Sequence, residues 1–380
     1  MCGINGIYNF TGQHLADVPS LISGMNKSIA HRGPDDEGTW NTADHKLFFG
    51  HRRLSIIDLS QLGHQPMLDE HGNAIIFNGE IYNYQELKKA IPDHHFKSDS
   101  DTEVLMELLH RKGTACLKDL NGMFAFAWWN NKEQKLILAR DRIGKKPLYY
   151  TLQNGVLAFS SEIRALLTLP WVKAQPDDES LYHFLTFNQV SSPKTLFRNI
   201  YKIAPASYIT ANSNVVDQPV VYWDVEYKNI AEKDEQSICS RINKELTDAV
   251  SLRMVADVPV GAFLSGGVDS SAIVAYMNQL GFSKIKTYSI GFSHQPDYTE
   301  LKYAEKIAKK YGTEHFEKIV QPDDLKELLP EMASIFDEPL ADATAIPIWF
   351  ISKLARENGT IVVQTGDGSD EIFGGYLYFH

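Results

Sequence analysis

The segment VPVGAFLSGGVDSSAIVAYMNQL, residues 258–280, decides the fold of the second half of the chain. The run VGAFL is short and apolar, as in a buried strand, and SSAIVAYMNQL continues as a helix. Between them, Gly266 and Gly267 let the backbone approach a phosphate closely, and the N–H groups that open the helix supply donors at the positive end of its dipole. The loop lacks the Gly-Lys-Ser/Thr ending of a Walker loop. The segment therefore predicts an anion-binding loop that follows a strand.

Strand-like and helical patterns alternate on both sides of this segment. A helix with Ile238, Ile242, Leu246 and Val250 on one face precedes it. After it come the strand-like runs KTYSIGF, HFEKIV and TIVVQTG, with helical stretches between them. Such alternation is typical of a parallel sheet wrapped by helices, an α/β arrangement. The sequence stops at YLYFH with no closing helix, so we expect this domain to be truncated at its C-terminus.

The first half of the chain is dense in short strand patterns, which predicts an α+β domain with helices packed outside its sheets. Asn154-Gly155 has the composition of a hairpin turn. Two helices are predicted, one over residues 19–30 and one after Ser100, where Ser100 and Glu103 have the spacing of a capping box. A polar stretch and the charged segment AEKDEQ follow. We therefore expect domains at 2–205 and 235–380, joined by a linker at 206–234.

The composition excludes several classes of function. Lys and Arg total 37 against 48 Asp and Glu, a formal net charge of −11, and no basic run is present, so nucleic acid is not an expected partner. Three well-separated cysteines without CxxC spacing favour a reducing compartment. No apolar run approaches the ~18 residues of a membrane span, and the N-terminus lacks a signal-peptide pattern. We expect a cytoplasmic protein without a membrane partner.

Cys2 is the first candidate catalytic residue. Removal of Met1 would give one residue both a thiol and a free α-amine, and the amine can serve as the general base for the thiol. A lone cysteine at position two is more often chance than catalysis. Four further motifs change this balance: HRGPDDEG at 31–38, HRRLSI at 51–56, FNGEIYNY at 77–84 and SDTE at 100–103.

Together with Cys2-Gly3-Ile4, these motifs resemble the glutaminase domain of class II glutamine amidotransferases. That family belongs to the N-terminal nucleophile hydrolases, which implies two stacked sheets between helical layers. The resemblance implies that Arg53 pairs with the carboxylate of glutamine, and that Glu80 and Asp101 receive its ammonium. It also implies that the Asn78 amide and the Gly79 N–H stabilise the oxyanion, and that the pocket is lined by Leu54, Ser55, Ile56 and Ile57.

Two segments that match the same family are not assigned to glutamine itself, namely HRGPD and residues 139–150. In HRGPD, Arg32 and Asp35 either order the loop that covers glutamine or fix a turn at Pro34. The segment ARDRIGKKPLYY, residues 139–150, is interpreted chiefly as structural.

In the second half, SGGVDSS and the later TGDGSDEIFGGY resemble the pyrophosphate loop and a companion loop of ATP pyrophosphatases, which form acyl-adenylates. The resemblance implies an ATP site with Mg²⁺ ligated by Asp269 and Asp370. The other residues it assigns to ATP or pyrophosphate are Leu264, Ser265, Gly266, Gly267, Ser270, Ile290, Thr365 and Gly366.

The two halves in this order resemble the asparagine synthetase family. The implied reaction converts glutamine, ATP and aspartate to glutamate, asparagine, AMP and pyrophosphate through β-aspartyl-AMP. Thr365 and Asp367 depart from the SGEGSDE-like loop of that family, so a uronic acid of surface polysaccharide synthesis stays open as the acceptor. A glutaminase alone, or a non-catalytic module, is the third alternative. The sequence does not determine the assembly state, and a homodimer stays open.

Overall fold

The computed structural model describes residues 1–12, 15–227, 234–293 and 299–377. The chain divides into two compact units, Met1–Tyr227 and Lys228–His380. The segment expected to be a linker from residue 206 begins instead with strand β11 (Ser207–Ala211), which pairs with β7 (Lys135–Arg140) of the first unit. β12 (Val220–Val221) pairs on the other side of β11, so part of the predicted linker belongs to a sheet of the first unit. Part of the predicted linker, 228–233, lies outside the described residues.

The first unit contains two six-stranded sheets in which every strand pair is antiparallel. The first sheet has the order β10 (Tyr201–Lys202), β8 (Tyr149–Gln153), β9 (Val156–Ser160), β1 (Gly3–Asn9), β3 (Leu47–Arg53) and β2 (Asp36–Asn41). The second has the order β12 (Val220–Val221), β11, β7, β6 (Gly122–Asn130), β5 (Ala74–Ile81) and β4 (Met67–Leu68).

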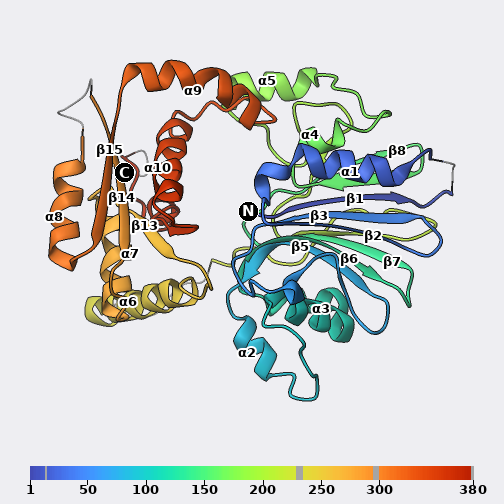
Figure 1. Cartoon of the computed structure of the whole chain (residues 1–380), viewed down its shortest axis with the longest axis horizontal. Coiled ribbons are helices and arrows are strands. Elements are labelled where there is room, and N and C mark those ends of the chain that lie inside the picture. Colours follow the sequence, from blue (N-terminus) through green and yellow to red (C-terminus); the bar gives the residue numbers. More distant parts are fainter. Residues whose placement is uncertain (13–14, 228–233, 294–298, 378–380) are drawn as a thin grey trace. The chain divides into compact units, whose positions relative to one another are not determined.

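Helices cover the outer faces of the two sheets, as Figure 1 shows. One cluster of buried side chains, including Tyr8, Phe49 and Phe159, lies between the sheets. The first sheet packs its other face on α1 (Val18–Ser28) and α4 (Ile163–Leu166), and the second packs on α2 (Tyr84–Lys89) and α3 (Asp101–Lys112). The remaining helical elements are η1 (Ala30–Arg32), η2 (Gln61–Gly63), η3 (Gly113–Lys118) and α5 (Asp178–Phe187). The predicted layers, helix on sheet on sheet on helix, are confirmed.

Local chemistry explains two of the connections. Asn154 and Gly155 have φ angles of 51° and 72°, so both residues of the β8–β9 hairpin turn occupy the left-handed region that Asn and Gly tolerate best. Helix α3 begins after Ser100, whose side chain accepts a hydrogen bond from Thr102 N at 3.1 Å. The predicted capping box is wrong, because the Glu103 carboxylate is occupied by the N–H groups of Lys97 and Ser98.

The second unit contains a four-stranded parallel sheet, which confirms the α/β prediction. Its order is β15 (Glu314–Val320), β14 (Lys286–Phe292), β13 (Val260–Phe263) and β16 (Val362–Gln364). Within this unit α8 lies on one face of the sheet and α10 on the other (Figure 1), each with its own buried cluster. The helices are α6 (Glu235–Leu252), α7 (Val268–Gln279), α8 (Leu301–Tyr311), α9 (Pro322–Ile335), α10 (Ala345–Glu357) and α11 (Ser369–Phe373).

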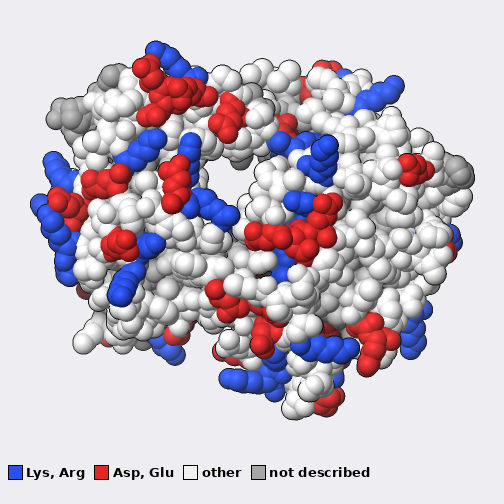
Figure 2. Space-filling view, in the orientation of Figure 1, with Lys and Arg blue, Asp and Glu red and all other residues white. Residues whose placement is uncertain are grey.

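No helix in the described ranges is long and apolar enough to cross a membrane. On the face seen in Figure 2, Lys and Arg are interspersed with Asp and Glu.

Candidate active sites

Cys2 lies at the start of β1, where the neighbouring Gly3 pairs with Arg52 of β3. Its Sγ accepts a hydrogen bond from Leu54 N at 3.4 Å and lies 3.6 Å from Leu54 O. Arg32 Nε donates to the Cys2 carbonyl at 2.9 Å, and Arg32 Nη1 donates to Glu162 at 2.8 Å. Leu54 therefore holds the thiol of Cys2, and Arg32 holds its carbonyl.

Opposing effects act on the pKa of the Cys2 thiol. Burial raises the pKa of Cys2, and the hydrogen bond from Leu54 N–H is the largest effect that lowers it. The chain's terminal amino group and the Lys146 ammonium also lower this pKa, while the Glu80 carboxylate raises it. Deprotonation of the thiol thus depends on which charges stand beside it.

A small pocket beside Cys2 brings together most residues that the sequence assigned to glutamine. Its lining includes Cys2, Arg53, Leu54, Ile56, Ile57, Gly79, Glu80 and Asp101. Ser55 is not part of this lining. Its N–H instead donates to Asp35 Oδ2 at 2.8 Å, which ties the HRGPD segment to the loop after β3. Arg32 and Asp35 therefore both hold backbone around the pocket.

Asn78 and Gly79 are consecutive residues of β5; Gly79 lines this pocket, whereas Asn78 is not among its lining residues. Asn78 is 1% exposed, and within the described residues neither its Oδ1 nor its Nδ2 has a hydrogen-bond partner. A buried amide left unpaired costs about 1–3 kcal/mol, so its retention indicates a partner that arrives with a ligand. A side chain at Gly79 would lie 2.3 Å from Met123 O, so glycine is required there.

Side chains on both sides hold the residue before Asn78. Phe77 N donates to Gln65 Oε1 at 2.6 Å, and His51 Nε2 donates to Phe77 O at 3.1 Å. Burial lowers the pKa of His51 to about 3, so this ring is neutral. The sequence analysis did not assign a role to His51 or Gln65, although HRRLSI contains the former.

Two carboxyl groups line the pocket, of which Asp101 is buried and Glu80 is half-buried. Burial first, and then the neighbouring Asp101, raise the pKa of Glu80 well above its ordinary value. Burial raises the pKa of Asp101 to about 6, although Asp101 accepts a hydrogen bond from Ile81 N at 2.8 Å. Adjacent carboxylates that resist ionisation together are suited to receive a cation, such as an ammonium group.

The Arg53 guanidinium is 6% exposed and donates to the backbone carbonyls of the following loop, at Ile57, Asp58 and Ser60. A Cβ on Gly63 would lie 1.9 Å from Arg53 Nη2. The loop is thus folded around the cation, which lines the same pocket as Cys2.

Lys146 is the charged residue near Cys2 that the sequence analysis missed. It is 5% exposed, and burial lowers its pKa to about 8. The Asp141 carboxylate folds the preceding loop by accepting from the N–H groups of Ile143, Lys145 and Lys146. The segment 139–150 had been interpreted as structural. Only the fold shows that it brings an ammonium beside the N-terminus.

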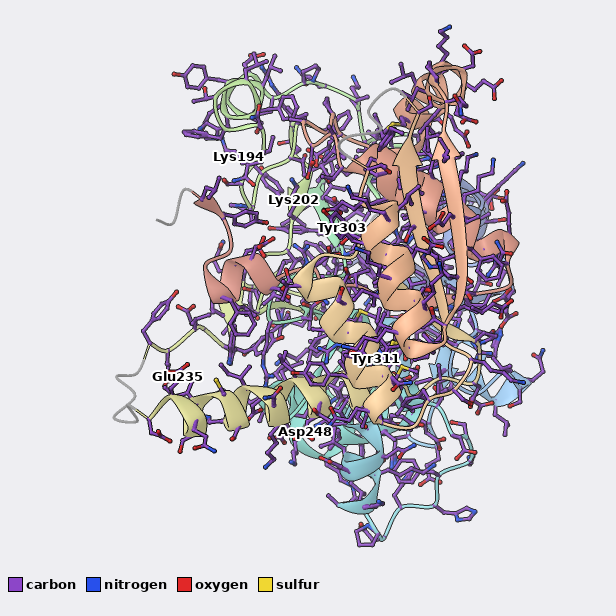
Figure 3. All side chains as sticks on the ribbon, turned by 90° about the vertical axis from the view of Figure 1, so that its left-hand side faces the viewer. Lys194, Lys202, Glu235, Asp248, Tyr303 and Tyr311 are labelled. Atoms are coloured by element: carbon purple, nitrogen blue, oxygen red, sulfur yellow. The ribbon has the colours of Figure 1, made fainter. Side chains whose placement is uncertain are left out.

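The predicted phosphate loop in the second unit is closed by its own hydroxyls. Ser265 N donates to Ser270 Oγ at 3.2 Å, and Gly267 N donates to Ser265 Oγ at 3.2 Å. Gly266 has φ of 85°, and a Cβ there would lie 2.5 Å from both Ala304 N and Tyr303 Cβ at the start of α8. Figure 3 labels Tyr303 near the beginning of this helix and Tyr311 at its end. Glycine is required for this loop to form against α8.

The other predicted nucleotide residues lie at strand ends of the same unit. Gly366, after β16, lies against the start of α7, because a Cβ there would be 2.9 Å from Asp269 Cβ. Ile290 is half-buried in β14, whereas the Leu264 side chain belongs to a buried core cluster, so Leu264 can offer a ligand only its backbone.

The two carboxylates that the sequence assigned to Mg²⁺ are Asp269 and Asp370. The described residues contain no group of three or more His, Cys, Asp or Glu side chains able to hold a metal. The carboxylates of Asp269 and Asp370 make no hydrogen bond or ion pair within the described part of the chain. Because Mg²⁺ prefers oxygen ligands and keeps several waters, one or two such carboxylates beside a phosphate loop fit this ion.

Two family models match the chain. The model described as "Glutamine amidotransferase domain" matches residues 1–223, and "Asparagine synthase" matches residues 241–380.

Named relatives align over nearly the whole chain. A glutamine-hydrolysing asparagine synthetase homologue of Methanocaldococcus jannaschii is 37% identical, covering 99% of this chain and 76% of that protein. Asparagine synthetase 1 of Bacillus subtilis is 38% identical, covering 99% of this chain. Amidase chry2 of Gibberella zeae is 32% identical, covering 100% of this chain. The chain spans only 59% and 60% of the lengths of the latter two relatives. By these matches, the chain belongs to the family of glutamine-hydrolysing asparagine synthetases.

Proposed function

We propose that this chain is the glutaminase domain and at least part of the ATP-dependent synthetase domain of an asparagine synthetase. Glutamine would be hydrolysed at Cys2, and the ammonia would convert a β-aspartyl-adenylate to asparagine. One observation carries the first half of this proposal. The Cys2 thiol shares a pocket with the Arg53 cation, the Glu80–Asp101 pair and Gly79. Gly79 follows Asn78 in β5, and the buried amide of Asn78 has no hydrogen-bond partner in the described part of the chain.

The glutaminase reaction follows from these groups. After loss of Met1, the α-amine of Cys2 takes the thiol proton, and the thiolate attacks the side-chain carbonyl carbon of glutamine. Negative charge develops on the carbonyl oxygen, which Asn78 Nδ2 and the Gly79 N–H would stabilise. Collapse of this intermediate, with the amine returning its proton, expels ammonia and leaves a glutamyl thioester. Water then releases glutamate and regenerates the thiol.

Substrate orientation uses the opposite charges of the pocket. Arg53 would hold the α-carboxylate of glutamine, and Glu80 with Asp101 would hold its α-ammonium. The raised pKa values of the two carboxyl groups support this assignment, because a bound ammonium would relieve their repulsion.

In the second unit, an acceptor carboxylate would attack the α-phosphorus of ATP and release pyrophosphate into the SGGVDSS loop. The N–H groups that begin α7 and the hydroxyls of Ser265 and Ser270 would hold the leaving phosphates. Asp269 and Asp370 would hold Mg²⁺, which neutralises phosphate charge when bound. The remaining proposed contacts, Ile290, Thr365, Gly366 and the Leu264 backbone, would surround the nucleotide.

Aspartate is the acceptor that the named asparagine synthetases support. A second candidate is another carboxylate, such as a uronic acid. Two observations favour this second acceptor. A relative of comparable identity is named an amidase. In the loop whose sequence departs from the SGEGSDE-like pattern, Thr365 Oγ1 donates to Asp367 Oδ2 at 2.8 Å. We further propose a cytoplasmic location, supported by three free cysteines. A homodimer stays a prediction, which light scattering would test.

The proposal is tested with the purified full-length protein after mass spectrometry confirms loss of Met1. Glutamine, Mg-ATP and either aspartate or a panel of uronic acids are supplied, and glutamate, pyrophosphate and amide product are measured. Aspartate-dependent pyrophosphate and asparagine support the leading proposal, and product from a uronic acid supports the second. Glutamate release with no acceptor-dependent pyrophosphate would leave only the glutaminase half.

A further inference from the structure

A buried lysine lies beside the N-terminus of the chain. Lys146 is 5% exposed, and within the described residues its ammonium makes a single hydrogen bond, to Met1 Sδ at 3.0 Å. A thioether is a weak acceptor, and processing removes it together with Met1. The mature protein therefore keeps an ammonium, with three donors, where the new α-amine of Cys2 begins.

Lys146 is not among the residues that line the pocket beside Cys2. Its ammonium contacts Met1, whereas Arg53, Glu80 and Asp101 line the pocket. A role in binding glutamine is therefore disfavoured, and an action through Cys2 is favoured.

We propose that Lys146 is a positioning residue that keeps the α-amine of processed Cys2 unprotonated, so that this amine can accept the thiol proton. The inference rests on the proposed function of Cys2 as the nucleophile. Its physical basis is repulsion, since a second positive charge in a buried site disfavours protonation of the amine. The same ammonium stabilises the thiolate, and the pKa of Cys2 is lowered by Lys146.

Other charges face Lys146 from several elements. Glu80 of β5 and Asp141, which follows β7, favour its charged form, while Arg32 of η1 opposes it. Arg32 is itself paired with Glu162, and Glu80 stands beside Asp101 on the pocket side. A bound glutamine ammonium would neutralise that carboxylate pair. Within the described residues, the Lys146 ammonium has no carboxylate at hydrogen-bonding distance, so its positive charge would remain beside the amine.

The test compares the pH dependence of glutamine hydrolysis in three full-length proteins with confirmed loss of Met1: wild type, Lys146→Met and Lys145→Met. Lys145 is the exposed neighbour in the same loop, so its substitution removes an equal charge away from the thiol. We expect Lys146→Met to shift the acidic limb of the kcat/KM profile to higher pH by about one unit. At pH values below this limb, kcat/KM should therefore be about tenfold lower than in the wild type. The two curves should converge near pH 9, and KM and the Lys145→Met profile should stay unchanged.

An acidic limb that does not move in Lys146→Met would overturn the inference, whatever the loss in rate, because a structural role lowers activity at every pH. Loss of glutamine hydrolysis in Cys2→Ala tests the function of Cys2 separately, so the two failures are distinguishable. If the variant does not fold, the wild-type protein carrying ¹³C-labelled lysine keeps the test open. One lysine should titrate near pH 8 and shift when Cys2 is alkylated, and absence of any such response would refute the coupling.

Discussion

Replacement of Asn78 by alanine should separate activity from stability. In the ligand-free protein both polar atoms of this amide are buried without a partner in the described part of the chain, so the side chain costs about 1–3 kcal/mol of folding free energy. Its removal should therefore leave the free energy of unfolding unchanged or raise it by up to about 2 kcal/mol. Loss of one oxyanion donor should lower kcat for glutamine hydrolysis by about 10²- to 10³-fold.

Asn26 provides the matched control, because it is also a fully buried asparagine of the same unit. Its Oδ1 accepts from Asn5 Nδ2 at 2.9 Å, and its Nδ2 donates to Glu37 at 3.2 Å and to Gly38 O at 3.3 Å. Asn26→Ala breaks three hydrogen bonds and leaves buried partners unpaired, so it should cost about 3 kcal/mol. For a unit of this size, that lowers the melting temperature by roughly 6–12 °C.

The assay pairs thermal unfolding with steady-state release of glutamate for both variants. Asn78→Ala should be stable with kcat lowered about 10²- to 10³-fold, whereas Asn26→Ala should be unstable. If Asn78→Ala lost as much stability as Asn26→Ala and kept wild-type kcat, Asn78 would be an ordinary core residue.

Three further outcomes are expected. Gly63→Ala should raise KM for glutamine at least tenfold, because the new methyl displaces the Arg53 guanidinium. Synthesis with added ammonia should persist. An unchanged KM for glutamine would exclude Arg53 from glutamine binding. KM for glutamine should rise as pH falls below about 6, since protonation of Asp101 removes the charge that attracts the substrate ammonium. A KM that stays constant between pH 5 and 7 would contradict this role of Asp101. Gly266→Ala should abolish ATP–pyrophosphate exchange and leave glutamine hydrolysis intact, since a side chain there meets the Tyr303 backbone and Cβ. Retained exchange would show that this loop does not bind the nucleotide.

The periodicity of apolar residues predicted the architecture well, because the strands and helices of both units follow local sequence patterns. Alternating strand and helix segments identified the parallel sheet, and Asn154-Gly155 identified a hairpin whose turn needs two positive φ angles. The capping box failed at Glu103 because the loop before α3 competes for the same carboxylate. The segment after residue 206 pairs as β11 between β7 and β12. Its Ile209 and Ala211 belong to the buried cluster between the sheets, a tertiary contact that the polar residues following them conceal in the sequence.

The pocket beside Cys2 was largely predictable because most of the residues proposed to bind glutamine stand in short motifs. The structure gathers Arg53, Glu80 and Asp101 around Cys2, as the motifs indicated. Lys146 could not be assigned in this way. It is 144 positions from Cys2, and its relevance depends on burial beside the N-terminus rather than on its local sequence.

The most direct test of the account is mass spectrometry of the covalent intermediate. Protein with Met1 removed is mixed with glutamine, quenched in acid within one turnover and digested. The account predicts a glutamyl thioester on the N-terminal peptide that begins with Cys2, and neither adduct nor glutamate release in Cys2→Ala. Glutamate release that persists in Cys2→Ala, or an adduct on Cys116 or Cys239, would contradict the assignment of the nucleophile.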